Sequence, residues 1–242
     1  MERLRNLVSA RRLAALAGIL FFVLQIAAPD PNMGSESPSA AAVQRFYEAN
    51  AGALGLAFVM SGLAGLSFLV FITALRDEAF ARGATGGGAV DLIMGAAILI
   101  AGFQLAATAL WVAPALTTGA DPAVVGTWGV IASASRNLLV EATTFWRGLL
   151  LGAVALVALR HAVLPRWLGW TAGAVAAAAL LGPIGFVESP ITPVGTMLGF
   201  GSYIAFHFWV LLAGVSLAWR TRSPAIDRSL PSSEPSTAAQ VG

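Results

Sequence analysis

Residues 90–113 read VDLIMGAAILIAGFQLAATALWVA, and Asp91 is the only charged side chain in this run. The hydrocarbon core of a bilayer is about 30 Å thick, and about 20 apolar helical residues are needed to cross it. The stretch therefore predicts a transmembrane helix. Apolar segments of similar length elsewhere in the chain are interpreted in the same way.

Five more segments reach or approach this length, each apolar and bounded by arginine, proline or polar loops. Together with the first stretch they predict six spans, at about residues 13–28, 52–75, 90–113, 140–160, 168–187 and 196–219. The expected fold class is all-α, a polytopic transmembrane helix bundle over residues 1–222. Residues 223–242 are rich in Ser, Pro, Ala and Thr, and we expect them to form a disordered cytoplasmic tail.

The composition agrees with a membrane protein and excludes several other classes. Of the 242 residues, 57% are hydrophobic and 11% are charged, whereas a soluble domain carries about 25% charged residues. The net charge is only +2 and the arginines flank apolar runs, so nucleic acid is not an expected partner. The chain contains no Cys and no Lys, which excludes disulfides, zinc–thiolate sites and lysine Schiff bases. We expect no cofactor and no metal site.

The arginine distribution predicts the orientation of the bundle. With six spans and the N-terminus inside, eleven of the fourteen arginines lie in cytoplasmic segments and Arg45 lies in an outer loop. Cytoplasmic loops carry an excess of positive charge, so both termini are predicted to be cytoplasmic. A seventh span over residues 124–135 is too short to cross and would nearly erase this bias.

Three segments carry expectations about the outer side and the N-terminus. Residues 124–138 are expected to form an amphipathic helix, either on the membrane surface or continuous with the fourth span. The first span has the basic flank of a cleaved signal peptide, but an uncleaved anchor is favoured because five further spans follow it. In the outer loop at residues 29–50, Ser37 or Ser39 is expected to cap a short helix. That helix, which carries Val43, Phe46 and Tyr47, is expected on the membrane surface rather than over the bundle as a lid.

Polar side chains within the predicted spans gather in the outer leaflet. Ionisable groups inside a membrane cost several kcal/mol unless they are paired or hydrated. Arg147 lies about six residues, or roughly 9 Å, below the predicted outer boundary, so we expect it to pair with a carboxylate or an amide from another helix. The candidate ligand-binding residues are Gln104, Glu141, Arg147, Glu188, Tyr203 and His207.

The expected partners of Arg147 on other helices are Glu188 and Gln104. Glu141 lies six positions earlier on the same helix and does not make a simple i,i+4 pair with it. Asn137, Glu141 and Thr144 share one helix face. The layer has two interpretations: it fixes helix register by polar contacts, or it lines an outward-opening pocket for a small polar or anionic ligand.

Three functions follow from these interpretations. The leading one is a non-enzymatic membrane protein that binds or passes a small solute through the pocket around Arg147. The second is a structural or regulatory subunit with a membrane protein partner, in which case the polar layer is fully satisfied and leaves no cavity. The third is a membrane-embedded enzyme that uses Glu141 or His207. No residue is assigned as catalytic, and the oligomeric state is left open.

Residues 163–170 read VLPRWLGW, and this inner loop resembles those of small bacterial, largely actinobacterial, membrane proteins of a family of unknown function. The basic N-terminus, the outer loop with Tyr47 and Asn50, and the number of spans are similar. The resemblance implies a six-helix fold in the bacterial cytoplasmic membrane and implies no activity. The use of Arg alone as the basic residue and the high Ala content agree with a high-GC genome.

Overall fold

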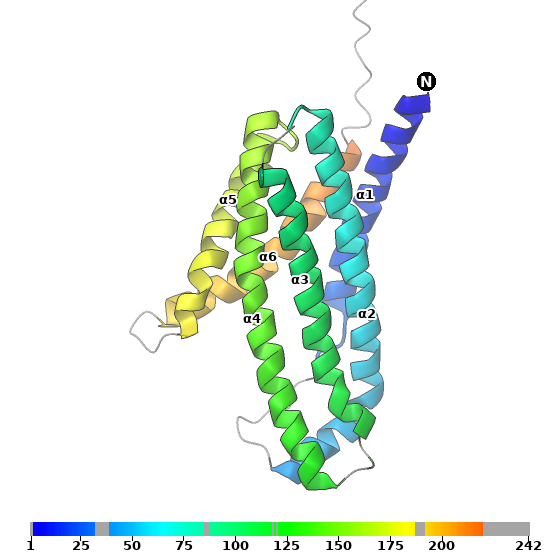
Figure 1. The fold of residues 1–242 in the computed structure, drawn as a ribbon, viewed down its shortest axis with the longest axis vertical. Helices are drawn as coiled ribbons and strands as arrows, with labels where there is room; N and C mark the ends of the chain where they lie inside the picture. The colour runs from blue at the N-terminus through cyan, green and yellow to red at the C-terminus, as the bar shows by residue number, and fades with distance from the viewer. Residues whose placement is uncertain are drawn as a thin grey trace, which may run out of the picture.

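The computed structural model describes residues 2–31, 39–84, 88–117, 119, 121–186 and 192–219. Glu188, Ser37 and the tail predicted at residues 223–242 lie outside this part of the chain. All regular structure within it is helical, which confirms the prediction of an all-α fold. The elements are α1 (Glu2–Ala27), α2 (Ala40–Ala81), α3 (Gly88–Val112), η1 (Ala113–Thr117), α4 (Pro122–His161), α5 (Arg166–Leu181), η2 (Gly182–Phe186) and α6 (Thr192–Trp219) (Figure 1).

Five of these helical segments are long and apolar enough to cross a membrane, as a multi-pass protein requires. They are α2, α3 with η1, α4, α5 as far as Gly185, and α6. The apolar part of α1, Arg12–Ala27, is shorter than the other five. The chain therefore has helices compatible with a multi-pass membrane protein, and the sixth apolar helix, in α1, is shorter than a membrane span requires.

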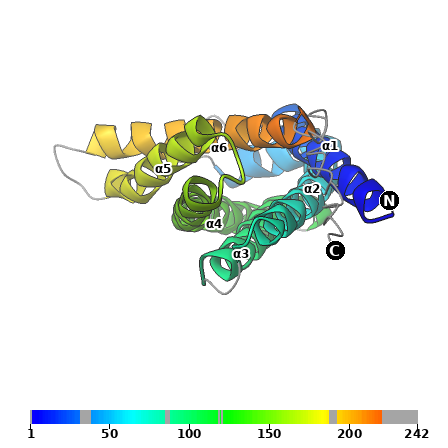
Figure 2. The same cartoon turned by 90° about the horizontal axis from the view of Figure 1, so that it is seen from above.

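The six helices form a closed ring in chain order. Each helix packs against the next along the chain, and α6 returns to pack against α1. The view along the bundle shows this ring, in which α2 and α4 also meet across the interior (Figure 2). The core is built from aromatic and branched side chains, with Phe21, Phe68 and Phe206 at its centre.

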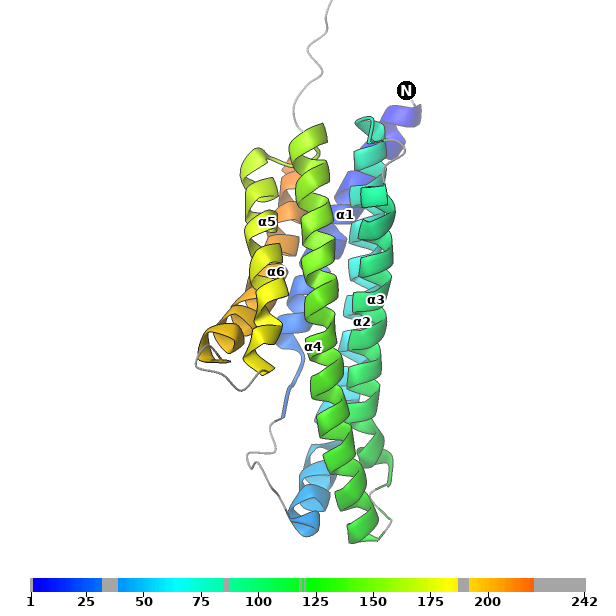
Figure 3. The same cartoon turned by 60° about the vertical axis from the view of Figure 1, so that its left-hand side comes forward.

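Two helices are much longer than a membrane span. α2 has 42 residues and α4 has 40, so each is about 60 Å long, roughly twice the hydrocarbon thickness. Figure 3 shows the start of α4 and the start of α2 extending beyond the adjoining ends of α5 and α6. Residues 124–138 are therefore continuous with the fourth span, which resolves the alternative that the sequence left open.

The short helix predicted at residues 29–50 is not a separate element. Ser39 caps it as expected, accepting a hydrogen bond from the Ala42 amide at 3.3 Å, but the helix continues without a break into α2. Val43 and Tyr47 are fully buried against α4, where Gly129 leaves room for both side chains. A Cβ at Gly129 would lie 2.3 Å from Val43 Cγ1, so the glycine permits this close packing.

The residue that caps the C-terminal end of α4 has a strained backbone conformation that can be tested. Ala162 caps this helix at φ 49° and ψ 34°, a left-handed conformation that costs an L-residue about 1–2 kcal/mol. Ala162→Gly is expected to stabilise the protein by about 0.5–1 kcal/mol, because glycine adopts this conformation freely but loses more entropy on folding. Thermal unfolding in detergent measures the change.

Ala81→Gly is the matched control, because Ala81 is exposed in the last helical position of α2. There glycine only weakens a helix, and a small loss of stability is expected. A lower melting temperature for Ala162→Gly would show that the cap is not strained.

Candidate ligand site

A cavity of about 390 Å³ opens between α4, α6 and η2. Its volume is within the range of about 300–1,000 Å³ that is typical of small-molecule sites. Its α4 residues recur at helical spacing along one face, and so do its α6 residues. The lining residues are Asp30, Gln104, Arg136, Val140, Glu141, Arg147, Gly182, Gly185, Thr196, Gly199, Phe200 and Tyr203.

Arg147 lies in this cavity and is 4% exposed. Its Nε donates to the Thr143 carbonyl at 3.4 Å, and its Nη2 donates to Thr144 Oγ1 at 2.8 Å. Its Cζ lies 5.0 Å from the centroid of the Tyr203 ring, a cation–π distance. The guanidinium is thus held from three directions, while its buried Nη1 has no hydrogen-bond partner in the described part of the chain.

Glu141 is joined to Arg147 through a hydroxyl rather than directly. Thr144 Oγ1 donates to Glu141 Oε2 at 3.5 Å and accepts from Arg147 Nη2. The partner expected for Arg147 was a carboxylate or an amide of another helix, yet the hydrogen bonds that it makes to described residues are within α4. Gln104 lines the same cavity, and Glu188 lies outside the described residues.

Tyr203 and His207 come from α6, and only the first lines the cavity. His207 is 4% exposed, and its Nδ1 donates to the Tyr203 carbonyl at 2.7 Å, since a carbonyl oxygen only accepts. Its ring lies 4.4 Å from that of Tyr203 and stacks on Phe21 at 5.2 Å. His207 therefore packs against the Tyr203 ring and supports it on the side that faces the aromatic core.

An ion pair that the sequence did not predict lies at the mouth of the cavity. Arg136 Nη2 lies 2.7 Å from Asp30 Oδ1, and the Arg136 guanidinium lies 4.9 Å from the centroid of the Trp111 ring. The Asp30 side chain is 67% exposed, so the cavity reaches the protein surface here. The only sequence signal was that Arg136 remained unexplained by the charge bias of the loops.

A second cavity of about 100 Å³ adjoins the first. The two share Asp30, Gln104, Arg136, Val140 and Tyr203 as wall residues. The smaller one is further lined by hydroxyl and amide groups of Gln25, Ser61 and Thr108. Ser61 and Thr108 hydrogen-bond to each other across α2 and α3 at 3.1 Å.

The site offers charge and hydrogen bonds on a rigid frame of helices. Within the described chain, no group of three or more acidic or histidine side chains is placed to hold a metal ion. Four of the six candidate ligand residues, Gln104, Glu141, Arg147 and Tyr203, line one cavity. Such an arrangement is suited to binding a polar ligand. Comparisons of the chain with protein-family models, curated proteins and solved structures found no match.

Proposed function

We propose that this protein binds or passes a small polar solute through an outward-facing cavity at Arg147. The observation that carries the proposal is the buried Arg147 Nη1, which has no partner among the described residues and belongs to a side chain lining the cavity. An unsatisfied buried donor costs about 1–3 kcal/mol or more when it is charged. Nη1 itself has almost no accessible surface, so a ligand oxygen reaches it only when the guanidinium turns toward the cavity, and that contact removes the cost.

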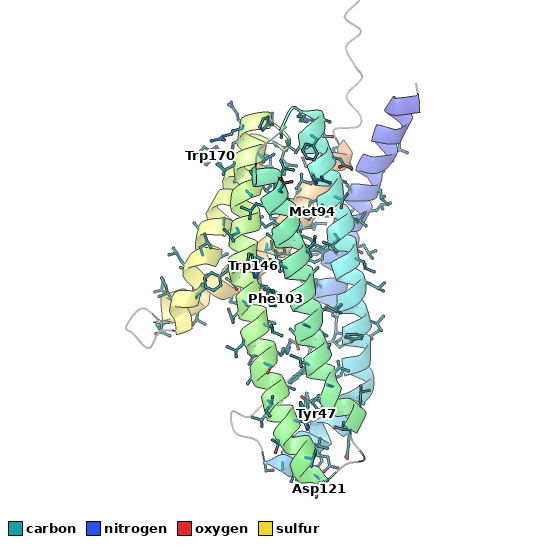
Figure 4. All side chains as sticks on the ribbon, in the orientation of Figure 1. Tyr47, Met94, Phe103, Asp121, Trp146 and Trp170 are labelled. Atoms are coloured by element: carbon teal, nitrogen blue, oxygen red, sulfur yellow. The ribbon has the colours of Figure 1, made fainter. Side chains whose placement is uncertain are left out.

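The proposal includes six spans, with α1 as the sixth, and both termini on the cytoplasmic side. We place the protein in a bacterial cytoplasmic membrane, among the proteins with an LPRWLGW-type inner loop. Exposed tryptophans support the placement, since aromatic belts mark membrane interfaces. Trp170 is 70% exposed and lies at the end opposite Tyr47 and Asp121 (Figure 4).

The two alternative functions have less support. A structural or regulatory subunit requires a polar layer satisfied within the bundle and without a cavity, whereas Arg147 has a free donor beside about 390 Å³ of space. An enzyme that uses Glu141 or His207 requires these residues to converge on one accessible site. His207 instead faces Phe21 and Phe206 in the aromatic core.

The topology is testable because the natural chain has no Cys. Single substitutions Glu48→Cys and Ala81→Cys place a thiol at exposed positions near opposite ends of α2. We expect a membrane-impermeant maleimide to label Glu48→Cys in intact cells and Ala81→Cys only after permeabilisation. The reverse pattern would invert the orientation, and labelling of both in intact cells would contradict the span assignment.

The binding proposal is tested by ligand-linked thermal stability of the purified protein. Acetate, lactate and alanine are the probes, and at least one is expected to raise the melting temperature. Arg147→Gln is expected to abolish the rise, a loss of affinity of about tenfold or more, because a charged hydrogen bond is removed. Arg147 forms no direct ion pair within the described part of the chain, so its replacement leaves no directly paired carboxylate behind and this variant is expected to fold.

Arg45→Gln is the matched control, since Arg45 is exposed and donates a hydrogen bond to the Ala41 carbonyl of its own helix. It is expected to keep the full thermal response. If no probe shifts the melting temperature, or if Arg147→Gln responds like the wild type, the cavity is not a site for these solutes.

A further inference from the structure

Four charged side chains line the larger cavity, and their charges balance. Asp30 and Glu141 are acidic, and Arg136 and Arg147 are basic. Asp30 and Arg136 form a direct ion pair at the mouth, with 2.7 Å between Nη2 and Oδ1. These two charges are thus compensated before any ligand enters.

The inner pair differs because Glu141 and Arg147 are not in direct contact. Each bonds to the same hydroxyl, Thr144 Oγ1, at 3.5 Å for Glu141 Oε2 and at 2.8 Å for Arg147 Nη2. A carboxylate has about four acceptor positions, and the one bond to Glu141 from described residues is long. Glu141 therefore has free acceptor capacity on the wall that also holds Arg147, whose buried Nη1 has no partner among the described residues.

A ligand with a single charge satisfies only one of these groups. An anion on Arg147 Nη1 is attracted to the guanidinium but repelled by the Glu141 carboxylate on the same wall. A cation bound to Glu141 is attracted to the carboxylate but repelled by the Arg147 guanidinium. Both interactions are strong at the low effective dielectric of a largely buried site, so neither kind of ion is well matched to the wall.

We propose, as a refinement that rests on the proposed function, that the solute is a zwitterion. Its anionic group accepts from the Arg147 guanidinium, and its ammonium group donates to Glu141. Such a ligand is neutral overall, as is the wall, and it fills both free hydrogen-bonding positions. Tyr203, supported from behind by His207, keeps the guanidinium in place before the ligand arrives.

Two sources share this chemistry, a free amino acid and a zwitterionic lipid headgroup. A free amino acid enters past Asp30, where the cavity meets the surface. A headgroup enters from the side, beside the 67% exposed ring of Phe200 and the glycines at positions 185 and 199. The common feature is one anionic and one ammonium group a few ångströms apart.

Titration calorimetry on the full chain in a maltoside detergent tests the refinement with three matched probes. β-Alanine carries both charges, propionate lacks the ammonium group, and ethylamine lacks the carboxylate. We expect β-alanine to bind at least about tenfold more tightly than either of the other two. Glycine and γ-aminobutyrate then report the preferred separation of the two charges.

Glu141→Gln separates the refinement from the proposed function. We expect it to weaken β-alanine binding about tenfold, to the level of propionate, and to leave propionate binding unchanged or stronger. Glu48→Gln is the matched control, because Glu48 is exposed and accepts from Gln44 on its own helix. It is expected to leave all affinities unchanged.

A separate set of measurements tests a lipid headgroup as the source of the ligand. A zwitterionic headgroup is supported if glycerophosphoethanolamine, a phosphodiester with no net charge, binds more tightly than the amino acids. A Glu141-dependent rise in melting temperature in phosphatidylethanolamine over phosphatidylglycerol nanodiscs supports it as well. If propionate binds as tightly as β-alanine and Glu141→Gln has no effect, the proposal that the ligand is a zwitterion is wrong. Arg147-dependent binding then still stands. Absence of Arg147-dependent binding by every probe overturns the refinement together with the proposed function.

Discussion

Replacing Gly195 with alanine is expected to lower the free energy of unfolding by about 2–3 kcal/mol. A Cβ at this position would lie 2.1 Å from the backbone nitrogen of Gly185 and 2.7 Å from its Cα. Backbone atoms cannot rotate away as the end of a side chain can, so the start of α6 must move away from η2. Denaturation of the purified protein in detergent by SDS titration measures the loss.

The same substitution is expected to weaken solute binding, because Gly185 lines the cavity. Gly182 and Gly199 make a similar close approach one turn further into the bundle, where a Cβ at Gly182 would lie 2.8 Å from Gly199 Cα. The contact between η2 and α6 is thus a backbone contact that forms one wall of the site.

Gly201→Ala is the matched control in the same helix. Gly201 is exposed, and a Cβ there meets no atom within 4 Å, so alanine is expected to be neutral or to stabilise by up to about 1 kcal/mol through its higher helix propensity. If Gly195→Ala were as stable as Gly201→Ala, the close approach of α6 to η2 would not exist in solution.

Hydropathy predicts where these helices are apolar but not where they begin. The span predicted at residues 52–75 is the middle of α2, which runs Ala40–Ala81. A membrane-length window detects only the stretch that lipid requires, whereas helix ends are set by local hydrogen bonds such as the Ser39 cap. The residues before the predicted span stay helical because Val43 and Tyr47 pack on the glycine face of α4.

The candidate site was partly predictable because depth in a membrane follows from sequence. Counting residues from the predicted boundary places Gln104, Glu141, Arg147 and Tyr203 in one leaflet, and the structure places them around one cavity. That they bind a ligand remains a prediction. His207 was listed with them although its predicted depth was the middle of the sixth span, and depth does not give the rotation of a helix that turns this side chain to the aromatic core.

The ion pair between Asp30 and Arg136 at the mouth of the cavity could not be predicted from the sequence. Asp30 and Arg136 are separated by 106 positions, and no periodicity links a residue after one helix to a residue inside another. Their meeting depends on how α1 packs against the rest of the ring. The hydroxyl of Thr144 was recognised as sharing a face with Glu141, but its position between Glu141 and Arg147 requires the actual rotamers.

Phe21→Ala is expected to destabilise the protein by about 3–4 kcal/mol, the second large effect, because a buried ring is removed from a packed core. Phe21 is 3% exposed and contacts the rings of Phe68 at 5.0 Å, Phe206 at 6.1 Å and His207 at 5.2 Å. SDS titration measures the loss, and binding of β-alanine is expected to weaken as well.

The expected loss of binding tests whether Phe21 supports the ligand site or contributes only to the general packing of the core. Phe22→Ala is the control, since Phe22 lies one position along α1 and contacts the half-exposed Phe208 at 5.0 Å; a loss of less than about 1 kcal/mol is expected, with binding intact. If Phe21 supports the site through His207 and Tyr203, Phe21→Leu restores most of the stability but only part of the affinity, because leucine fills volume without stacking on the imidazole. Recovery of both in parallel would show that Phe21 acts by volume alone.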